Sequence, residues 1–243
     1  MNNEKFTAAC DLILNHHTRA GIGTLKEKTL HAVLKNYYEP YTDNHEIKIG
    51  GYIADIVGEK GIIEIQTRNF YSIRKKLSAF LDVANVTIVF PIASTKWLIW
   101  QDTQTGETTK KRKSPKKGTP YEVFYELYQI KQFLTHPNFN LCIVMVDIQE
   151  YRNLNGWSHN KKQGSSRYER IPVNLVNEIY INGINDYIKL IPDGLPEHFT
   201  VKDYKTTSRL SLRSAGTALN VLNSIGAVKQ VSKNGNAYVY ERL

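Results

Sequence analysis

A glycine-bounded hairpin at residues 51–67 is the feature that most constrains how this chain can fold. The run YIADIV is followed by the loop GEKG and then by IIEIQT. Two β-rich runs separated by a short loop that contains glycine predict an antiparallel pair of strands. If Val57 faces Ile62 across the loop, counting back along both strands places Asp55 opposite Glu64.

The two opposed carboxylates suggest what this hairpin does. Directly opposed residues of an antiparallel pair share one face of the sheet, with Cβ atoms roughly 4.5–5.5 Å apart. Like charges at this separation repel, which destabilises the hairpin unless a cation lies between them. Gln66 follows Glu64 at the strand period of two and so shares its face. The pattern predicts a divalent-metal site on the sheet.

Length, charge and cysteine content narrow the class of protein. The 243 residues suffice for one large domain, or for a medium domain plus a small one. A formal net charge of +9 favours an anionic partner, for which nucleic acid is the expected class. Cys10 and Cys142 are the only cysteines, which argues against a disulfide framework and a zinc site. The apolar runs are too short to span a bilayer and no secretory signal is visible, so we expect a cytoplasmic protein without membrane contact.

Hydrophobic periodicity before residue 181 predicts an α/β fold, with helices packed on a mixed sheet. The polar and basic segment 152–170 contains Gly, Ser and Asn, which predicts an exposed loop. The expected helices cover 4–16, 24 to near 40, 72–81 and 121–134, and the expected strands cover 46–49, 52–57, 62–67, 86–91, 96–100 and 141–146.

The character of the chain changes near Ile181, where we expect a boundary between a domain of residues 1–180 and one of residues 181–243. The second domain is expected to contain helices at 185–191, 200–204 and 211–224, followed by strands at 228–233 and 237–241 joined by an Asn-Gly turn. Three helices followed by a two-stranded wing resemble the winged helix-turn-helix superfamily.

The winged-helix resemblance implies that one face of helix 211–224 contacts the bases or phosphates of DNA. The other face, with Leu212, Ala215, Leu219 and Leu222, is expected to pack inward. The alternative is a protein–protein or dimerisation module, which would make the protein a homodimer. The implied DNA contacts are Arg209, Arg213, Ser214, Thr217 and Asn220, with Lys233 at the tip of the wing.

The order of acidic residues resembles the PD-(D/E)XK nuclease superfamily over roughly residues 20–150. A helix with Glu27 is followed by a strand with Asp55 and then by Glu64 in the run EIQ. The resemblance implies a restriction-endonuclease-like fold in which Asp55, Glu64 and the backbone carbonyl of Ile65 hold Mg²⁺ or Mn²⁺, with Glu27 assisting. It also implies hydrolysis of phosphodiester bonds, with double-stranded DNA as the partner.

Gln66 departs from the motif of that superfamily, because it stands where a lysine is usual. Glutamine can hydrogen-bond to the attacking water and position it, but it carries no positive charge. Arg68 and Lys48 are the basic neighbours that would replace the missing lysine. The alternative is a catalytically inactive nuclease fold that serves as a DNA-binding or regulatory protein.

Simpler roles account for several of the same residues. Glu27 lies three residues after Thr24, as in a helix capping box. Asp55 and Glu64 would need no metal on an open, solvated sheet face. The basic segments 110–117 and 152–170 would either line a phosphate track or form solvated loops.

Overall fold

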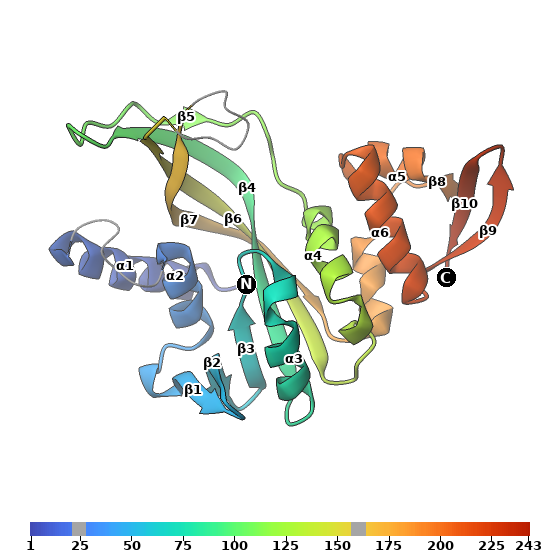
Figure 1. Ribbon diagram of the computed structural model, residues 1–243, viewed down its shortest axis with the longest axis horizontal. Helices are drawn as coiled ribbons and strands as arrows, with labels where there is room; N and C mark the ends of the chain where they lie inside the picture. The colour runs from blue at the N-terminus through green and yellow to red at the C-terminus, as the bar shows by residue number, and fades with distance from the viewer. Residues whose placement is uncertain (21–27, 157–163) are drawn as a thin grey trace. The chain divides into compact units, whose positions relative to one another are not determined.

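The computed structural model describes residues 1–20, 28–156 and 164–243 (Figure 1). These residues form an α/β fold with a seven-stranded mixed sheet flanked by helices, which confirms the expected class. The strand order is β1-β2-β3-β4-β6-β7, and β5 pairs with β4. The strands are β1 His45–Ile49, β2 Tyr52–Gly58, β3 Gly61–Ile65, β4 Val86–Asp102, β5 Arg112–Lys113, β6 Phe139–Leu154 and β7 Ser166–Ile181.

Six α-helices and a second, three-stranded sheet complete the described secondary structure. The second sheet has the order β8-β10-β9, with β8 at His198–Thr200, β9 at Val228–Asn234 and β10 at Ala237–Arg242. None of the described helices combines the length and the apolarity that crossing a membrane requires. The α-helices are α1 Asn3–Ala20, α2 Thr29–Tyr38, α3 Arg74–Leu81, α4 Phe124–Gln129, α5 Val201–Ser208 and α6 Leu212–Ser224. Short 3₁₀ helices occupy Thr42–Asn44, Phe70–Ile73, Pro120–Val123, Lys131–Phe133 and Ile184–Leu190.

The chain divides into two compact units, and each unit is assembled from three segments. Strands β4, β6 and β7 each contribute residues to both units. A domain boundary near residue 181 stays a prediction. The first unit contains residues 1–43, 93–118 and 145–177, and the second unit contains residues 44–92, 119–144 and 178–243.

Strands β2 and β3 pair in the register expected from the sequence. Val57 lies opposite Ile62, and Ile56 lies opposite Ile63. On its other edge β3 pairs in parallel with β4, from Ile62 opposite Val86 to Ile65 opposite Val89. Ile53, two residues before Asp55 in β2, is exposed and pairs with Lys48 of β1.

Gly61 at the start of β3 has a backbone conformation and surroundings that exclude a side chain. Its φ of +100° lies in the region that favours glycine. A Cβ atom built on Gly61 would collide with the carbonyl oxygen of Asn85. The same oxygen accepts the backbone N–H of Ile62 at 2.8 Å, so it is held in place beside the turn.

Helix α3 connects β3 to β4 and buries Leu77, Phe80 and Leu81 in the second unit. The helix expected at 72–81 is therefore confirmed, with a 3₁₀ turn at its start. In the same unit α4 packs against α6, and the two helices lie side by side in Figure 1. Because β3 and β4 pair in parallel, they need a crossover connection, and α3 supplies it.

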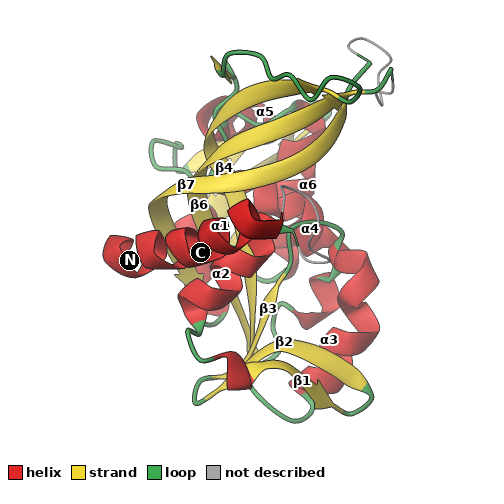
Figure 2. Ribbon diagram, turned by 90° about the vertical axis from the view of Figure 1, so that its left-hand side faces the viewer, coloured by secondary structure: helices red, strands yellow, loops and turns green. Residues whose placement is uncertain are grey.

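In the first unit, helices α1 and α2 pack against each other (Figure 2). The ring of Phe6 meets that of Tyr37 edge-on, with centroids 5.5 Å apart. The exposed loop predicted at residues 152–170 is wrong at both ends, because β6 continues to Leu154 and β7 begins at Ser166. Between the strands, Asn155 and Gly156 are exposed, and residues 157–163 lie outside the described part of the chain. The polar composition of these strands was misleading: several of their charged side chains pair across the strands.

The separate strands predicted at 86–91 and 96–100 are one continuous strand, β4. Near the C-terminus, α5, α6 and the β9–β10 hairpin lie at the predicted positions. Ala215, Leu219 and Leu222 of α6 are buried as expected. Leu212 is exposed, contrary to the prediction, because it is the first residue of α6 and belongs to the solvated first turn.

Candidate functional site

Asp55 and Glu64 lie together where the β2–β3 ladder ends. The backbone N–H of Asp55 donates to Glu64 Oε1 at 3.1 Å, and the backbone N–H of Ile65 donates to Asp55 Oδ2 at 2.8 Å. Each carboxylate therefore accepts a backbone N–H from the opposite strand. These two bonds fix both side chains relative to the sheet, as expected from the register.

Glu64 is the more buried of the two acids, with only 4% of its surface exposed. Burial, the largest cause, and the charge of Asp55 together raise the pKa of Glu64 to about 7, whereas Lys76 opposes the shift. Desolvation penalises the charged form of a carboxyl group, and a second carboxylate adds repulsion. The alternative in which both acids lie on an open, solvated face is therefore wrong for Glu64.

Lys76 supplies a positive charge at this site that the sequence did not predict. Its Nζ atom lies 2.6 Å from Glu64 Oε2 and 5.5 Å from the centroid of the Phe80 ring. Lys76 is the third residue of α3, twelve positions after Glu64. One signal was available in the sequence: the helix predicted at 72–81 has to pack on the strands, and Lys76 borders its apolar residues Leu77 and Phe80.

The side chain of Gln66 is used within the loop that follows β3. Its Nε2 atom donates to the carbonyl oxygens of Arg68 at 2.6 Å and Asn69 at 3.2 Å. Arg68 and Lys48, the basic residues considered as replacements for a lysine at position 66, are both exposed. Lys76 contacts Glu64 directly and is the better candidate for that role.

The donor set of this site suits a small, hard cation. Mg²⁺ is commonly held by one or two carboxylates and otherwise by water and substrate phosphate. Asp55, Glu64 and the carbonyl of Ile65 provide such oxygen donors. After burial, the charge of Asp55 is the second cause of the raised pKa of Glu64, and a cation between the two acids would offset this repulsion. Among the described residues, no cluster of three or more His, Cys, Asp or Glu side chains could hold a metal ion. Glu27 lies outside the described residues.

A second charged cluster lies in the first unit, around Glu150, of which only 1% is exposed. Arg152 Nη1 lies 2.7 Å from Oε1, and Lys96 Nζ and Arg167 Nε each lie 3.3 Å from Oε2. Burial would raise the pKa of Glu150, but the charges of Lys96, Arg167 and Arg152 outweigh it and lower this pKa below its usual value. Three cations surround one carboxylate, so the cluster as a whole is positive.

The structure describes segment 110–117 in full and segment 152–170 only in part. Arg112 and Lys113 form β5, and Lys113 Nζ lies 6.0 Å from the centroid of the Trp97 ring. Arg152 belongs to β6 and Arg167 to β7. Trp157, Lys161 and Lys162, which also belong to the segment 152–170, lie outside the described residues. A phosphate track along these segments stays a prediction.

Of the predicted DNA contacts on and before α6, Ser214 and Thr217 make hydrogen bonds within the protein. Arg209 has a left-handed backbone, with φ of 60°, at the end of α5. The Ser214 backbone N–H donates to the Ser211 side chain, and the Thr217 hydroxyl donates to the Arg213 carbonyl.

Asn220 and Lys233 are the other two predicted DNA contacts. Asn220 accepts a bond from Lys131 Nζ at 3.2 Å. Lys233 lies over the ring of Tyr238 at 4.7 Å. Arg213 and Lys233 are exposed.

Residues 28–182 match a family model described as "Domain of unknown function (DUF8091)". This match spans more than half of the chain. The chain belongs to the DUF8091 family. Asp55, Glu64, Lys76 and Glu150 all lie within the matched range, whereas Glu27 and α6 lie outside it.

A relative in Treponema pallidum (strain Nichols), described as "Uncharacterized protein", is 29% identical over 150 residues. The alignment covers 61% of this chain and 57% of the relative, so the chain matches little more than half of that protein's length. No solved structure matches the chain.

Proposed function

We propose that this DUF8091 protein is a Mg²⁺-dependent nuclease of the PD-(D/E)XK type that hydrolyses phosphodiester bonds in DNA. The observation that carries the proposal is the interleaved pair Asp55 and Glu64, with the Lys76 ammonium 2.6 Å from Glu64. The resemblance implies two acids on such a hairpin with a lysine beside them, and in this chain the lysine would come from α3 and not from position 66.

Asp55, Glu64 and the carbonyl of Ile65 would hold the ion. When bound, Mg²⁺ supplies Lewis acidity and positive charge beside the phosphate. The backbone N–H groups of Asp55 and Ile65 orient the carboxylates, so that they need not reorganise when substrate arrives.

Lys76 would perform the task that Gln66 cannot. Its ammonium has three N–H donors, so a bond to Glu64 leaves it able to contact a phosphate oxygen or the attacking water. It would stabilise the negative charge that develops on the phosphate. Gln66 would hold the loop after β3 through its bonds to Arg68 and Asn69.

The C-terminal elements would deliver DNA to this site. Helices α5 and α6 followed by the β9–β10 hairpin resemble a winged helix, and exposed cations on α6 and on the wing suit phosphate contacts. Arg213 and Lys233 are the strongest of these candidates. Asn220 would have to release Lys131 before it could contact a base.

A cleavage assay on plasmid and linear DNA, with Mg²⁺ or Mn²⁺ and with EDTA, tests the proposal. We expect metal-dependent cleavage that Asp55→Asn abolishes and that Lys76→Met lowers about 100-fold or more, with DNA binding preserved in both variants. Glu59→Gln, an exposed acid at the tip of the same hairpin, is the matched control and should cleave normally. Unchanged cleavage by Asp55→Asn would refute the assignment.

The second candidate is a catalytically inactive nuclease fold that binds DNA, and the Lys76–Glu64 ion pair favours it. An ammonium at 2.6 Å already compensates the charge of Glu64 without a metal. On this alternative, calorimetry would detect no Mn²⁺ binding to the wild type, and Lys76→Met would create or strengthen such binding. DNA would still be bound and not be cut under any metal condition.

A further inference from the structure

Two adjoining hollows in the second unit form one groove over α3 and α4. The first has a volume of about 460 Å³ and the second a volume of about 660 Å³. Both are lined by Tyr71, Arg74 and Gln132, so they adjoin each other at these residues. We define the groove by the residues that line these two hollows.

The groove is positively charged along its length. Arg74, Lys75, Lys76 and Lys131 line it. Among the described residues that form its walls there is no Asp or Glu. Two of these cations are held by neutral amides: Arg74 donates to Gln132 at 2.8 Å, and Lys131 donates to Asn220 at 3.2 Å. Lys76 instead pairs with the Glu64 carboxylate, which does not line the groove. Such a surface suits an anionic ligand.

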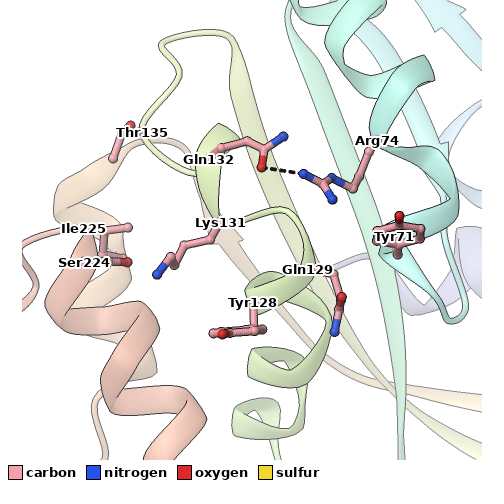
Figure 3. A pocket seen from close by; sticks show the side chains of 9 residues that line it. All are labelled: Tyr71, Arg74, Tyr128, Gln129, Lys131, Gln132, Thr135, Ser224 and Ile225. Carbon is pink, nitrogen blue, oxygen red and sulfur yellow. Dashed lines mark hydrogen bonds between the residues drawn. The ribbon is translucent and has the colours of Figure 1, made fainter.

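Tyrosine rings alternate with these cations. Tyr71 and Tyr128 are 61% and 49% exposed, which is high for aromatic side chains in a concave site. The Arg74 guanidinium lies 5.2 Å from the centroid of Tyr71, and Lys131 Nζ lies 5.6 Å from that of Tyr128. Figure 3 shows Tyr71 with Arg74 on one side and Ser224 with Ile225 on the opposite side, with Tyr128 and Lys131 between them.

We propose that this groove binds an unpaired nucleic acid strand, with the tyrosine rings stacking on bases and the cations contacting phosphates. Base–aromatic stacking next to a basic track is how proteins bind single strands without reading their sequence. The faces of bases inside a duplex are covered by their neighbours, so these rings can stack only on bases that are unpaired. The occupant is therefore a single-stranded segment.

Lys76 links the groove to the carboxylates, because it lines the second hollow and contacts Glu64. A strand in the groove would bring its phosphates next to the Asp55–Glu64 pair. The consequence for cleavage, a preference for substrates with unpaired segments, rests on the proposed function. The binding of the strand itself does not depend on it.

Fluorescence anisotropy in EDTA, with a labelled 15-nucleotide oligo-dT and a duplex of the same length, measures binding without cleavage. We expect Tyr71→Leu with Tyr128→Leu to weaken oligo-dT binding about 10-fold or more and to leave duplex binding within about 2-fold. Tyr71→Phe with Tyr128→Phe keeps both rings and should bind like the wild type. Tyr125→Leu removes a ring of the same helix that is 65% exposed and lies outside the groove, and should also bind normally.

Arg74→Gln and Lys131→Gln should each reduce the slope of log affinity against log salt for oligo-dT by roughly 0.7. Lys60→Gln, an exposed cation at the hairpin tip, should leave that slope unchanged. Oligo-dT binding that is equal in the Leu pair and the wild type, or equally weakened in the Phe and Leu pairs, would overturn the inference. If the protein binds oligo-dT but cleaves no DNA, the proposed nuclease is refuted and the proposal for the groove stands. If it cleaves DNA with metal, but Tyr71→Leu with Tyr128→Leu leaves oligo-dT binding unchanged, the proposal for the groove is refuted and the nuclease stands.

Discussion

Glu64 is a carboxyl group whose environment works against its charged form. Burial and the neighbouring Asp55 raise its pKa from 4.5 to about 7. The folded protein therefore holds this proton more tightly than the unfolded chain does. The resulting stabilisation is fully present below the unfolded pKa and is lost as the pH rises through the folded pKa.

The free energy of unfolding of the metal-free protein should therefore fall between about pH 5 and about pH 8, by up to about 3 kcal/mol from this group. Glu64→Gln is neutral at every pH and should flatten this dependence. Urea unfolding in EDTA at several pH values measures both curves. Parallel curves for the variant and the wild type would contradict the raised pKa.

Glu150 shows the opposite sign, because three cations lower its pKa despite its burial. Its stabilising contribution is present above the unfolded pKa and is lost as the pH falls through the folded pKa. We expect Glu150→Gln to lower the free energy of unfolding at pH 7 by about 3 kcal/mol, the lower end for a broken buried ion pair, since its cations keep some contact with water.

The difference between the two proteins should shrink as the pH falls through the lowered pKa of Glu150, because the wild-type carboxylate then becomes protonated. Thermal unfolding at a series of pH values from 7 downward would check this. A loss of stability that is equally large at low pH would mean that Glu150 contributes through packing and not through charge.

At the level of single elements, the start of α5 depends on a reciprocal cap. Thr200 accepts the Lys202 backbone N–H at 3.2 Å, and Asp203 accepts the Thr200 backbone N–H at 2.8 Å. The bonds that Asp203 accepts from the backbone N–H and the hydroxyl of Thr200 lower the pKa of Asp203. Thr200→Ala should destabilise the protein by about 1 kcal/mol, whereas Thr200→Ser should retain the cap. Chemical denaturation of both variants distinguishes loss of the cap from loss of the methyl group.

The elements that could be predicted are those whose signal is local. The β2–β3 register follows from a period of two and a short loop, so the meeting of Asp55 and Glu64 could be derived from spacing alone. Lys76 could not, because its contact depends on how α3 docks on the sheet, which no local period encodes. The strands β6 and β7 were missed at Arg152 and Arg167 because charged residues normally indicate solvent, and here they surround a buried acid.

For the molecule as a whole, the net charge of +9 predicts that binding to duplex DNA weakens linearly in log affinity as log salt increases. Arg213→Gln and Lys233→Gln should each lower the magnitude of this slope by about 0.9, with Lys60→Gln as the control. Titrations at four salt concentrations measure the slopes. Slopes that do not change in either variant would exclude α6 and the wing as the duplex contact.

Composition and periodicity were sufficient for the α/β class, but not for the way in which the units are assembled. Each compact unit draws on three separate segments, and the strands β4, β6 and β7 pass from one set of segments to the other. Whether distant segments share a core depends on their packing, and the order of helices and strands along the chain leaves this open. A change of composition near residue 181 indicates where the character of the sequence changes, and it does not indicate which segments pack together.

Substitutions of Gly61 should impair activity although Gly61 contributes no side chain to the site. Any residue with a Cβ at that position would be strained at a φ of +100° and would press on the Asn85 carbonyl, pushing β3 away from β4. Glu64 is three residues further along the same strand, so it would be displaced without any change to its chemistry. A random-mutagenesis screen for loss of activity should therefore recover Gly61 substitutions alongside Asp55 and Glu64, and circular dichroism of the purified Gly61→Ala protein would reveal a folding defect that Asp55→Asn lacks.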